Sequence, residues 1–277
     1  MIAGLVSAAA GVSETLLASV SRGVAELSQS RVLTQTGNRP WPLPDGPWLM
    51  AQTWRDLLFA HWALDPEIVR RALPPSLPVD TFDGRAWVGV TPFELSGLRP
   101  RGGPPLPGAS RFPELNVRTY TTLDAKPGIF FLSLDAANPL AVLAARRAYR
   151  LPYFRARMAI VREANAVHYS SERVSPDGDR ACFIADYRPT GGVSVATPGS
   201  LEYFLTERYC LYTVDESGLA LRAQIQHPPW PLQPASANLQ VNTMTRPWQI
   251  DLPQARPVLH YARLQNVLIW SLRPAGP

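Results

Sequence analysis

The stretch from residue 113 to residue 135, PELNVRTYTTLDAKPGIFFLSLD, limits the fold more than any other part of the sequence. Within it, residues 115–122 alternate in character from one side chain to the next. This predicts a β-strand, because successive strand residues face opposite sides of a sheet. Residues 129–134 are apolar on both faces, as in a strand buried inside a core. Residues 124–128 include Pro and Gly and predict the turn that joins the two strands.

Glu114, Asn116 and Arg118 share one face of the first strand and lie beside the apolar second strand. A charge in such a place is costly unless it is paired. Glu114 and Arg118 are separated by roughly 13 Å at the rise of a strand, so they cannot contact each other. Each side chain therefore needs a partner from another strand or from a ligand. Two interpretations remain open, an internal ion pair that ties strands together and a binding site.

The chain has 277 residues, which fits one large domain or two small ones. Its net charge of +5 comes almost wholly from arginines, which are scattered along the sequence. The absence of a basic stripe interleaved with aromatic residues argues against a nucleic-acid partner. Lys126 is the single lysine, so imine chemistry would need Lys126 or the amino terminus. Cys182 and Cys210 have no zinc or redox spacing and are expected to be free thiols.

The rest of the chain predicts a mainly antiparallel α+β domain with a few short helices. The 29 prolines favour strand edges and turns over long helices. Asp65-Pro66 and Asn138-Pro139 each place an N-cap residue before a proline, which predicts the start of a helix. Further short helices are expected at residues 199–205 and 235–244. The remaining predicted strands are residues 50–62, 79–81, 86–98, 155–162, 167–173, 180–188, 209–214, 220–226 and 258–272.

Apolar residues recur at helical spacing within residues 1–38, which predicts a separate amphipathic helical extension. No apolar run there is long enough to span a bilayer, and no basic region precedes the apolar residues as in a secretory signal. We interpret the segment as an appended helix, with a membrane-surface helix as the alternative. Residues 39–48 are a Pro-rich linker, and residues 49–277 form the domain. The expected location is the cytoplasm.

Seven segments carry a resemblance to a known family: TWRDLLFAHW, DTFDGRAWVGVTPF, FPELNVRTY, KPGIFFLSLDA, LPYFRARM, GSLEYFLTERYCLY and HPPWPLQ. They occur in one order within residues 50–272, and they resemble the YqjF-like family of bacterial proteins of unknown function. That family is similar in fold to the acetoacetate decarboxylase-like superfamily. The resemblance implies a mainly antiparallel β-barrel or cone with a ligand cavity inside.

The similarity to the decarboxylases also bears on the reaction. Those enzymes carry a carboxylate on a strand, then an apolar strand, a helix, and a Pro-Lys-Lys whose lysine forms the Schiff base. The matching order here runs from Glu114 to Pro152-Tyr153-Phe154, so Tyr and Phe stand where the lysines would be. A Schiff base needs an amine with a lowered pKa, and Lys126 on a turn is expected to be solvated. The resemblance therefore implies that this protein does not decarboxylate β-keto acids through an imine.

A cavity lined by apolar residues with a few convergent polar groups is the usual composition of a small-molecule pocket. The catalytic candidates for such a pocket are Glu114, Arg118 and Tyr153. Arg118 can hold a carboxylate with two hydrogen bonds, and Glu114 can act as a general base if burial raises its pKa. Tyr153 can donate a hydrogen bond to a developing oxyanion.

The candidates for substrate binding are Glu207, Arg208 and His227. For Glu207 and Arg208 the alternative is an internal ion pair or a solvated strand start, since adjacent strand residues face apart. His227 precedes Pro-Pro-Trp, and its alternative role is simply to end a strand. His61 lies among aromatic residues and is interpreted as a hydrogen-bonded core residue rather than a ligand.

Other classes of enzyme find little support. The sequence has no Gly-rich phosphate loop and no H-E-x-x-H motif, and its four histidines show no zinc spacing. We expect no cofactor and no metal, a small-molecule ligand as partner, and a homo-oligomer. Two functions remain open. One is a lyase-like or isomerase-like enzyme on a small carboxylated or carbonyl compound, and the other is a non-catalytic small-molecule binding or sensing domain.

Overall fold

The computed structural model describes residues 31–105, 108–174 and 180–276. This part of the chain is mostly strands with a few short helices, as predicted. Within these ranges no helix has both the length and the apolar character needed to cross a membrane. Most of the predicted N-terminal helix, residues 1–30, lies outside the described residues. In chain order the elements are β1 (Met50–Leu64), α2 (Pro66–Arg70), β2 (Ala86–Pro100), β3 (Phe112–Leu123), β4 (Lys126–Ala136), α3 (Pro139–Tyr149), β5 (Tyr153–Glu163), β6 (Ala166–Arg173), β7 (Cys182–Pro189), α4 (Leu201–Thr206), β8 (Cys210–Val214), β9 (Ala220–Gln226), β10 (Gln233–Asn242), η1 (Arg246–Trp248), β11 (Val258–Ile269) and β12 (Arg273–Pro274).

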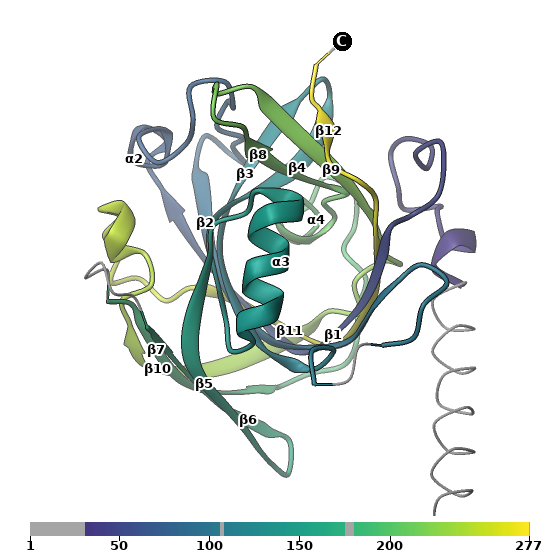
Figure 1. The fold of residues 1–277 in the computed structure, drawn as a ribbon. Helices are drawn as coiled ribbons and strands as arrows, with labels where there is room; N and C mark the ends of the chain where they lie inside the picture. Colours follow the sequence, from purple (N-terminus) through teal and green to yellow (C-terminus); the bar gives the residue numbers. More distant parts are fainter. Residues whose placement is uncertain (1–30, 106–107, 175–179, 277) are drawn as a thin grey trace, which may run out of the picture.

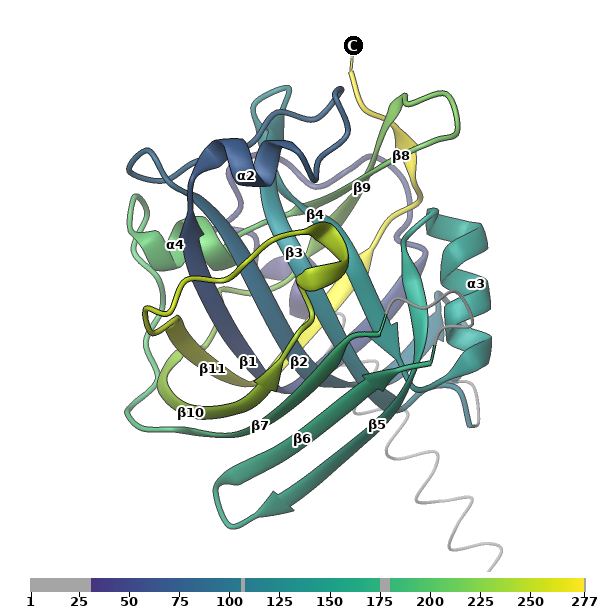
Figure 2. The ribbon, with the colours of Figure 1, turned by 90° about the vertical axis from the view of Figure 1, so that its left-hand side faces the viewer.

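The sheet closes on itself twice (Figure 1). Strands β4, β3, β2, β1 and β11 pair side by side in antiparallel fashion. β4 then pairs with β8, and β11 pairs with β9, which closes a first ring through the β8–β9 hairpin. β4 also pairs with β5, and β11 with β10, which closes a second ring through β6 and β7. Helix α3 lies across the opening of the first ring in Figure 1, and β5, β6 and β7 run along one side of the molecule in Figure 2.

Alternate residues of the shared strands supply two apolar cores. In β1, Leu57 and Phe59 belong to one buried cluster, whereas Leu58 and Ala60 belong to the other. The cluster of Leu57 and Phe59 also contains residues of β8, β9 and α3, so it lies inside the first ring. Because successive side chains point to opposite faces, a strand shared by two rings is buried on both faces. This is the physical reason for the almost wholly apolar run at residues 129–134.

The N-caps that the sequence predicts are present. The Asp65 side chain accepts a hydrogen bond from the amide of Glu67 at the start of α2. The Asn138 side chain accepts bonds from the amides of Leu140 and Ala141 at the start of α3. Each cap satisfies amides that have no partner within the helix, and the following proline has no amide hydrogen to satisfy. α3 is therefore fixed in position at its first turn, next to the end of β4.

The turn between β3 and β4 is shorter than predicted. Leu123 pairs with Lys126, so Asp124 and Ala125 alone form the turn, both with a φ of 54°. The prediction of a turn over residues 124–128 is wrong at its end, since Gly128 lies within β4. A Cβ atom at position 128 would lie 2.5 Å from the Tyr212 ring and 2.8 Å from the Cys210 carbonyl oxygen. Glycine is needed here for the close approach of β8 rather than for a turn.

Gly128→Ala is expected to lower the free energy of unfolding by about 1–3 kcal/mol, the usual cost of overpacking. The reason is that the Cys210 carbonyl belongs to the backbone of β8 and cannot rotate away. Urea unfolding would measure the loss. Gly192→Ala is the matched control, because nothing lies within 4 Å of a Cβ atom built there. An equal loss for both variants would contradict the tight contact between β4 and β8.

The helix predicted at residues 235–244 is wrong, because this segment forms β10. Ala235, Ala237 and Leu239 are half-buried and alternate with exposed polar residues. β10 pairs with β7 along most of its length. The inward-facing residues are mostly small, so the period-two signal in the sequence is weak. β7 lies about 50 residues earlier in the chain, and pairing with it makes this segment a strand. Strand preference depends on such tertiary contacts as well as on the local sequence.

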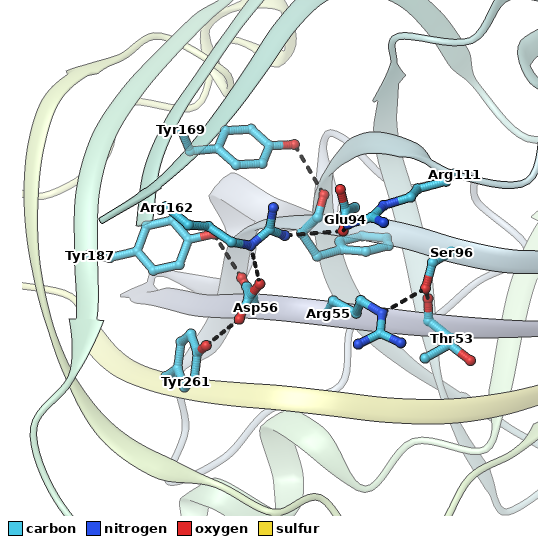
Figure 3. Close-up of polar contacts among 11 residues, drawn as sticks. Thr53, Arg55, Asp56, Glu94, Ser96, Arg111, Arg162, Tyr169, Tyr187 and Tyr261 are labelled. Carbon is cyan, nitrogen blue, oxygen red and sulfur yellow. Dashed lines mark hydrogen bonds and ion pairs between the residues drawn. The ribbon is translucent and has the colours of Figure 1, made fainter. Parts of the chain in front are cut away.

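A β-bulge at Asp56 ties the second ring together (Figure 3). The pairing of β1 with β2 shifts register between Arg55 and Ala60, and Asp56 has a φ of 49°, which Asp tolerates better than most residues. The Asp56 carboxylate accepts hydrogen bonds from the Tyr261 hydroxyl of β11 and from Arg162 Nε of β5, the latter at 2.7 Å. The Tyr187 hydroxyl of β7 donates to the Asp56 carbonyl at 2.7 Å. One bulge thus connects four strands.

Part of the predicted linker, residues 39–48, packs against β9. The guanidinium of Arg39 is buried and donates to the Ile225 carbonyl at 2.6 Å and to Gln226 Oε1 at 3.2 Å. It lies 5.0 Å from the Trp41 ring centroid and 5.2 Å from that of Tyr209. These cation–π contacts and hydrogen bonds fix the chain that enters the domain.

Candidate functional site

The first ring encloses a cavity of about 170 Å³ at the end that α3 covers. Its walls come from β1, β2, β3, β4, β5, β8, β9, β11 and α3. The polar residues that line it are Gln52, Thr91, Glu114, Asn116, Arg118, Tyr149 and Tyr153. The apolar residues include Leu57, Phe93, Leu95, Phe112, Ile129, Phe131, Leu134, Leu151, Leu211, Ile225 and Ile269. Most of this wall is therefore apolar, with its charged residues confined to β3.

Strand β3 places Glu114, Asn116 and Arg118 on the cavity side, as the alternation in the sequence predicts. All three side chains are buried. Arg118 pairs with Gly89 of β2, and a Cβ atom at position 89 would lie 2.7 Å from the His61 ring. The glycine leaves room for His61 behind the polar residues of β3. The packing beneath the site therefore depends on a missing side chain.

Glu114 is a buried carboxyl group that contacts Tyr153. The Tyr153 hydroxyl donates to Glu114 Oε2 at 3.2 Å, and both residues line the cavity. Burial raises the pKa of Glu114 to about 8, although the Tyr153 hydrogen bond opposes the rise. Burial, and then the neighbouring Glu114, hold the pKa of Tyr153 well above its ordinary value. At neutral pH both groups therefore carry their protons.

Arg118 is a buried cation with no acidic partner among the residues that the structure describes. Only 4% of its surface is exposed. Its guanidinium lies 5.0 Å from the Phe59 ring centroid and 5.9 Å from that of Tyr120. Nη2 donates to the Leu205 carbonyl at 3.3 Å, and Nε has no hydrogen-bond partner. Arginine stays charged in proteins, so a residue of fixed positive charge lines the cavity.

His61 and Tyr120 support Arg118 from behind. The Tyr120 hydroxyl lies 2.7 Å from His61 Nε2 and donates to the Leu205 carbonyl at 2.9 Å. Because the hydroxyl has one proton, His61 Nε2–H must donate to Tyr120. Burial, and next the charge of Arg118, hold the pKa of His61 well below its ordinary value, so the ring is neutral. The interpretation of His61 as a hydrogen-bonded core residue agrees with this geometry.

Glu207 and Arg208 lie elsewhere and do not line this cavity. The guanidinium of Arg208 pairs with Asp80 at 2.7 Å and lies over the ring of Phe204. The Glu207 carboxylate accepts from the Tyr209 hydroxyl and, at 3.0 Å, from the Trp230 amide. The two side chains use different partners, so the internal ion pair of the alternative interpretation involves Arg208 and Asp80.

His227 also lies outside the cavity lining. Its ring stacks on Tyr209 with centroids 4.6 Å apart, and its Nδ1 and Nε2 atoms lie 2.8 Å from the Pro228 carbonyl and 3.3 Å from the Arg208 carbonyl. Its contacts are those of a residue that follows directly on the end of β9. Glu207, Arg208 and His227 thus form a separate buried group next to the end of α4. Glu207 lines a second pocket, and the role of the three residues in substrate binding stays a prediction.

Four polar cavity residues escaped the sequence-based choice of site residues, namely Gln52, Thr91, Asn116 and Tyr149. Asn116 lies between Glu114 and Arg118 on the same face, and its Oδ1 has no hydrogen-bond partner. The alternation in the sequence placed it on this face with its neighbours, but its neutral side chain gave no reason to choose it. Gln52 and Thr91 come from β1 and β2, and no local pattern marks them. Gln52 and Thr91 reach the cavity because of strand pairings around the ring, and no local sequence pattern predicts these pairings.

Lys126 is half-buried at the first position of β4. It is not among the residues that line the cavity, and the described lining contains no lysine. Across the described ranges, no three histidine, cysteine or acidic side chains come together in a way that could hold a metal ion. What the cavity does offer is the guanidinium of Arg118, the protonated carboxyl group of Glu114 and the phenols of Tyr149 and Tyr153.

Solved structures define the class of this fold. The enduracididine biosynthesis enzyme MppR, complexed with the condensation product of pyruvate and imidazole 4-carboxaldehyde, matches with a TM-score of 0.57 at 12% identity, over 83% of this chain and 90% of that chain. Acetoacetate decarboxylase from Legionella pneumophila matches with a TM-score of 0.55 at 13% identity, over 88% of this chain and 95% of that chain. At such identities the likeness shows the fold alone. The chain has an acetoacetate decarboxylase-like fold, as the resemblance implied.

Sequence comparison gives the family. The model of DUF2071, described as an uncharacterized conserved protein, matches residues 51–266, and the chain belongs to this family. The uncharacterized protein YqjF of Bacillus subtilis is 49% identical over 231 residues, which is 83% of this chain and 94% of that protein. The resemblance to YqjF-like proteins is confirmed.

Proposed function

We propose that this protein binds a small carboxylic acid with a carbonyl group in the cavity of the first ring and acts on it by acid–base chemistry. The observation that carries the proposal is Arg118. A guanidinium that is 4% exposed, with an open Nε and no acidic partner in the described part of the chain, lacks the compensating charge that buried cations usually have. A ligand carboxylate would supply it through charge-assisted hydrogen bonds.

Glu114 is the proposed acid–base group, and Tyr153 is its positioning residue. Glu114 Oε2 accepts the Tyr153 hydrogen bond, so the proton of the neutral carboxyl group belongs on Oε1. From there it can be donated to a carbonyl oxygen and taken back from carbon or oxygen. A pKa of about 8 lies close to neutral pH, where a general acid or base works best. Tyr153 keeps its proton and would orient the carboxyl group.

The proposal excludes an imine with a cavity lysine. Tyr153 occupies the position where the resemblance to the decarboxylases would require a lysine, and Lys126 lies outside the cavity lining. Borohydride reduction in the presence of acetoacetate is therefore expected to leave the protein unlabelled, as followed by intact-protein mass spectrometry. Labelling at Lys126 would overturn this part of the proposal. A structural neighbour, MppR, has been solved with pyruvate, which supports an oxo acid as the kind of ligand.

A non-catalytic binding or sensing domain is the alternative use of the same cavity. The neutral state of Glu114 below pH 8 favours it, because a protonated carboxyl group recognises an acceptor without needing to transfer its proton. Glu114→Gln separates the two functions. A loss of turnover of roughly a hundredfold or more with binding retained supports the enzyme. A wild-type protein that binds oxo acids and converts none of them supports the binding domain.

Both functions fit a protein of the cytoplasm, where free thiols such as Cys182 and Cys210 stay reduced. We also propose that the protein self-associates. Self-association would leave the residues that line the cavity unchanged.

The role of Arg118 is tested by calorimetric binding of 4-methyl-2-oxopentanoate and its amide at pH 7. Arg118→Met keeps the length of the side chain and removes its charge, and it is expected to weaken binding of the acid roughly ten- to hundredfold. Arg157→Met is the matched control, because Arg157 is exposed on β5 and pairs with Glu172 away from the cavity. Equal affinity for the acid and the amide, or unchanged binding by Arg118→Met, would contradict the proposal.

A further inference from the structure

We infer that the ligand is a monocarboxylic acid with a compact apolar tail, and that helix α3 selects the tail through Ala145. This inference rests on the proposed function and narrows its substrate class. It is carried by the uneven distribution of polar groups in the cavity, by the size of the cavity, and by the small side chains with which α3 lines it.

The charged groups of the cavity lie on one strand, β3, whereas Gln52, Thr91 and Tyr149 add neutral polar groups from β1, β2 and α3. Glu114, Asn116 and Arg118 follow one another on β3, and Tyr153 contacts Glu114. Two buried polar atoms of this group, Asn116 Oδ1 and Arg118 Nε, have no hydrogen-bond partner. Arg118 Nε–H can donate to a ligand carboxylate, whereas Asn116 Oδ1 is an acceptor that only a donor on the ligand could meet.

The walls from β4, β8, β9 and β11 present only apolar side chains to the cavity. β4, β8, β9 and β11 contribute Ile129, Phe131, Leu134, Leu211, Ile225 and Ile269 to the cavity. A second carboxylate or a hydroxyl group placed against these side chains would lose its hydration without compensation. A hydrocarbon tail would instead gain from burial, by roughly fourfold in Kd for each methylene group.

The size of the cavity limits the tail. A dry engineered cavity of about 150 Å³ accepts benzene, and the volume here is about 170 Å³. The ligand is therefore close to benzene or a branched six-carbon acid in bulk. A long acyl chain would have to extend out through the opening next to α3.

Helix α3 keeps this space open with alanines. Ala141, Ala145 and Ala148 line the cavity and lie four and three residues apart, on one face of the helix. Ala141 and Ala145 are half-buried, whereas Ala148 is exposed at the rim. α3 is held in place because Arg146 Nε donates to the Tyr153 carbonyl at 2.5 Å. A larger side chain at position 145 would thus enter the cavity rather than move the helix.

Calorimetry with two 2-oxo acids, pyruvate and 4-methyl-2-oxopentanoate, tests the inference. The wild-type protein is expected to bind 4-methyl-2-oxopentanoate roughly fiftyfold more tightly than pyruvate, since three more carbons are buried. Ala145→Leu is expected to weaken binding of the larger acid by about tenfold or more and to change pyruvate binding by less than about twofold. Arg147→Leu is the matched control, because this exposed position on the same helix does not line the cavity.

The outcomes separate this inference from the proposed function. Equal affinity for both acids, with both lost in Arg118→Met, would overturn the apolar tail and leave carboxylate binding intact. A preference for the larger acid that Ala145→Leu leaves unchanged would overturn the role of α3. No binding of either acid by the wild-type protein would overturn the proposed function itself. The comparison of the two acids in the wild-type protein tests the apolar tail even if Ala145→Leu fails to fold.

Discussion

Raising the pH from 4.5 to 8.5 is expected to destabilise the wild-type protein relative to Glu114→Gln by about 4 kcal/mol, at about 1.4 kcal/mol per tenfold change in proton affinity. The folded protein holds the Glu114 proton with a pKa of about 8, whereas the ordinary value is 4.5. The stabilising contribution of the protonated Glu114 is therefore fully present below pH 4.5. It decreases as the pH rises from 4.5 to 8, and it changes no further above pH 8. The physical cause is burial of the carboxyl group in an apolar cavity.

Urea unfolding of both proteins at several pH values measures this difference, and other titrating groups cancel between them. Gln is the close neutral analogue of the protonated Glu, so the variant is expected to match the wild-type protein near pH 4.5. Glu216→Gln, at an exposed loop position, serves as control and is expected to follow the wild-type curve. A constant difference between wild type and Glu114→Gln across this pH range would mean that Glu114 is ionised in the folded protein.

Removal of Arg173 is expected to have an effect of similar size. Its Nη2 and Nε atoms donate to the two Asp135 carboxylate oxygens at 2.7 and 3.0 Å, and both side chains are almost fully buried. The guanidinium also lies 3.9 Å from the Phe154 ring centroid. Arg173→Met would leave the Asp135 carboxylate buried and unpaired, which costs about 3–5 kcal/mol. The loss would appear as a lower midpoint in urea.

The double variant Arg173→Met with Asp135→Val removes both charges and is expected to recover most of the loss, because an apolar pair often replaces a buried ion pair at little cost. Arg157→Met is again the matched control. The Arg157–Glu172 pair is exposed and contributes less than about 1 kcal/mol. If Arg173→Met were as stable as Arg157→Met, the ion pair between β4 and β6 would not hold the second ring together.

The sequence predicts those parts of the fold that depend on neighbours in the chain. The alternation in residues 115–122 places Glu114, Asn116 and Arg118 on one face, and that face lines the cavity. The capping pairs Asp65-Pro66 and Asn138-Pro139 mark the starts of α2 and α3. In each case the signal and the structure lie within a few residues of each other.

The parts that escaped prediction depend on contacts between distant segments. β10 is a strand because β7 pairs with it, although its own residues carry only a weak alternation. Gly128 reads as a turn residue, and only the approach of Tyr212 shows that it is a packing residue. β4 pairs in parallel with β5 and with β8, and these two pairings close the rings. No local sequence pattern predicts them.

The candidate site shows the same division. The sequence singles out Glu114 and Arg118 because charges beside an apolar strand need a reason. It cannot show that Tyr153 reaches Glu114 across 39 residues of chain, except through the resemblance to the decarboxylases. Glu207 and Arg208 carry an equally strong charge signal, yet Asp80, Tyr209 and the Trp230 amide satisfy them internally. Charge pattern alone does not separate a buried network from an open cavity.

A crystal structure of the protein with 4-methyl-2-oxopentanoate at pH 7 tests the central claim most directly. We expect the ligand inside the first ring, with its carboxylate against Arg118 Nε, its 2-oxo group next to Glu114, and its tail against Ala145. Ligand bound outside this cavity, or bound within it with the carboxylate turned away from Arg118, would contradict the proposal.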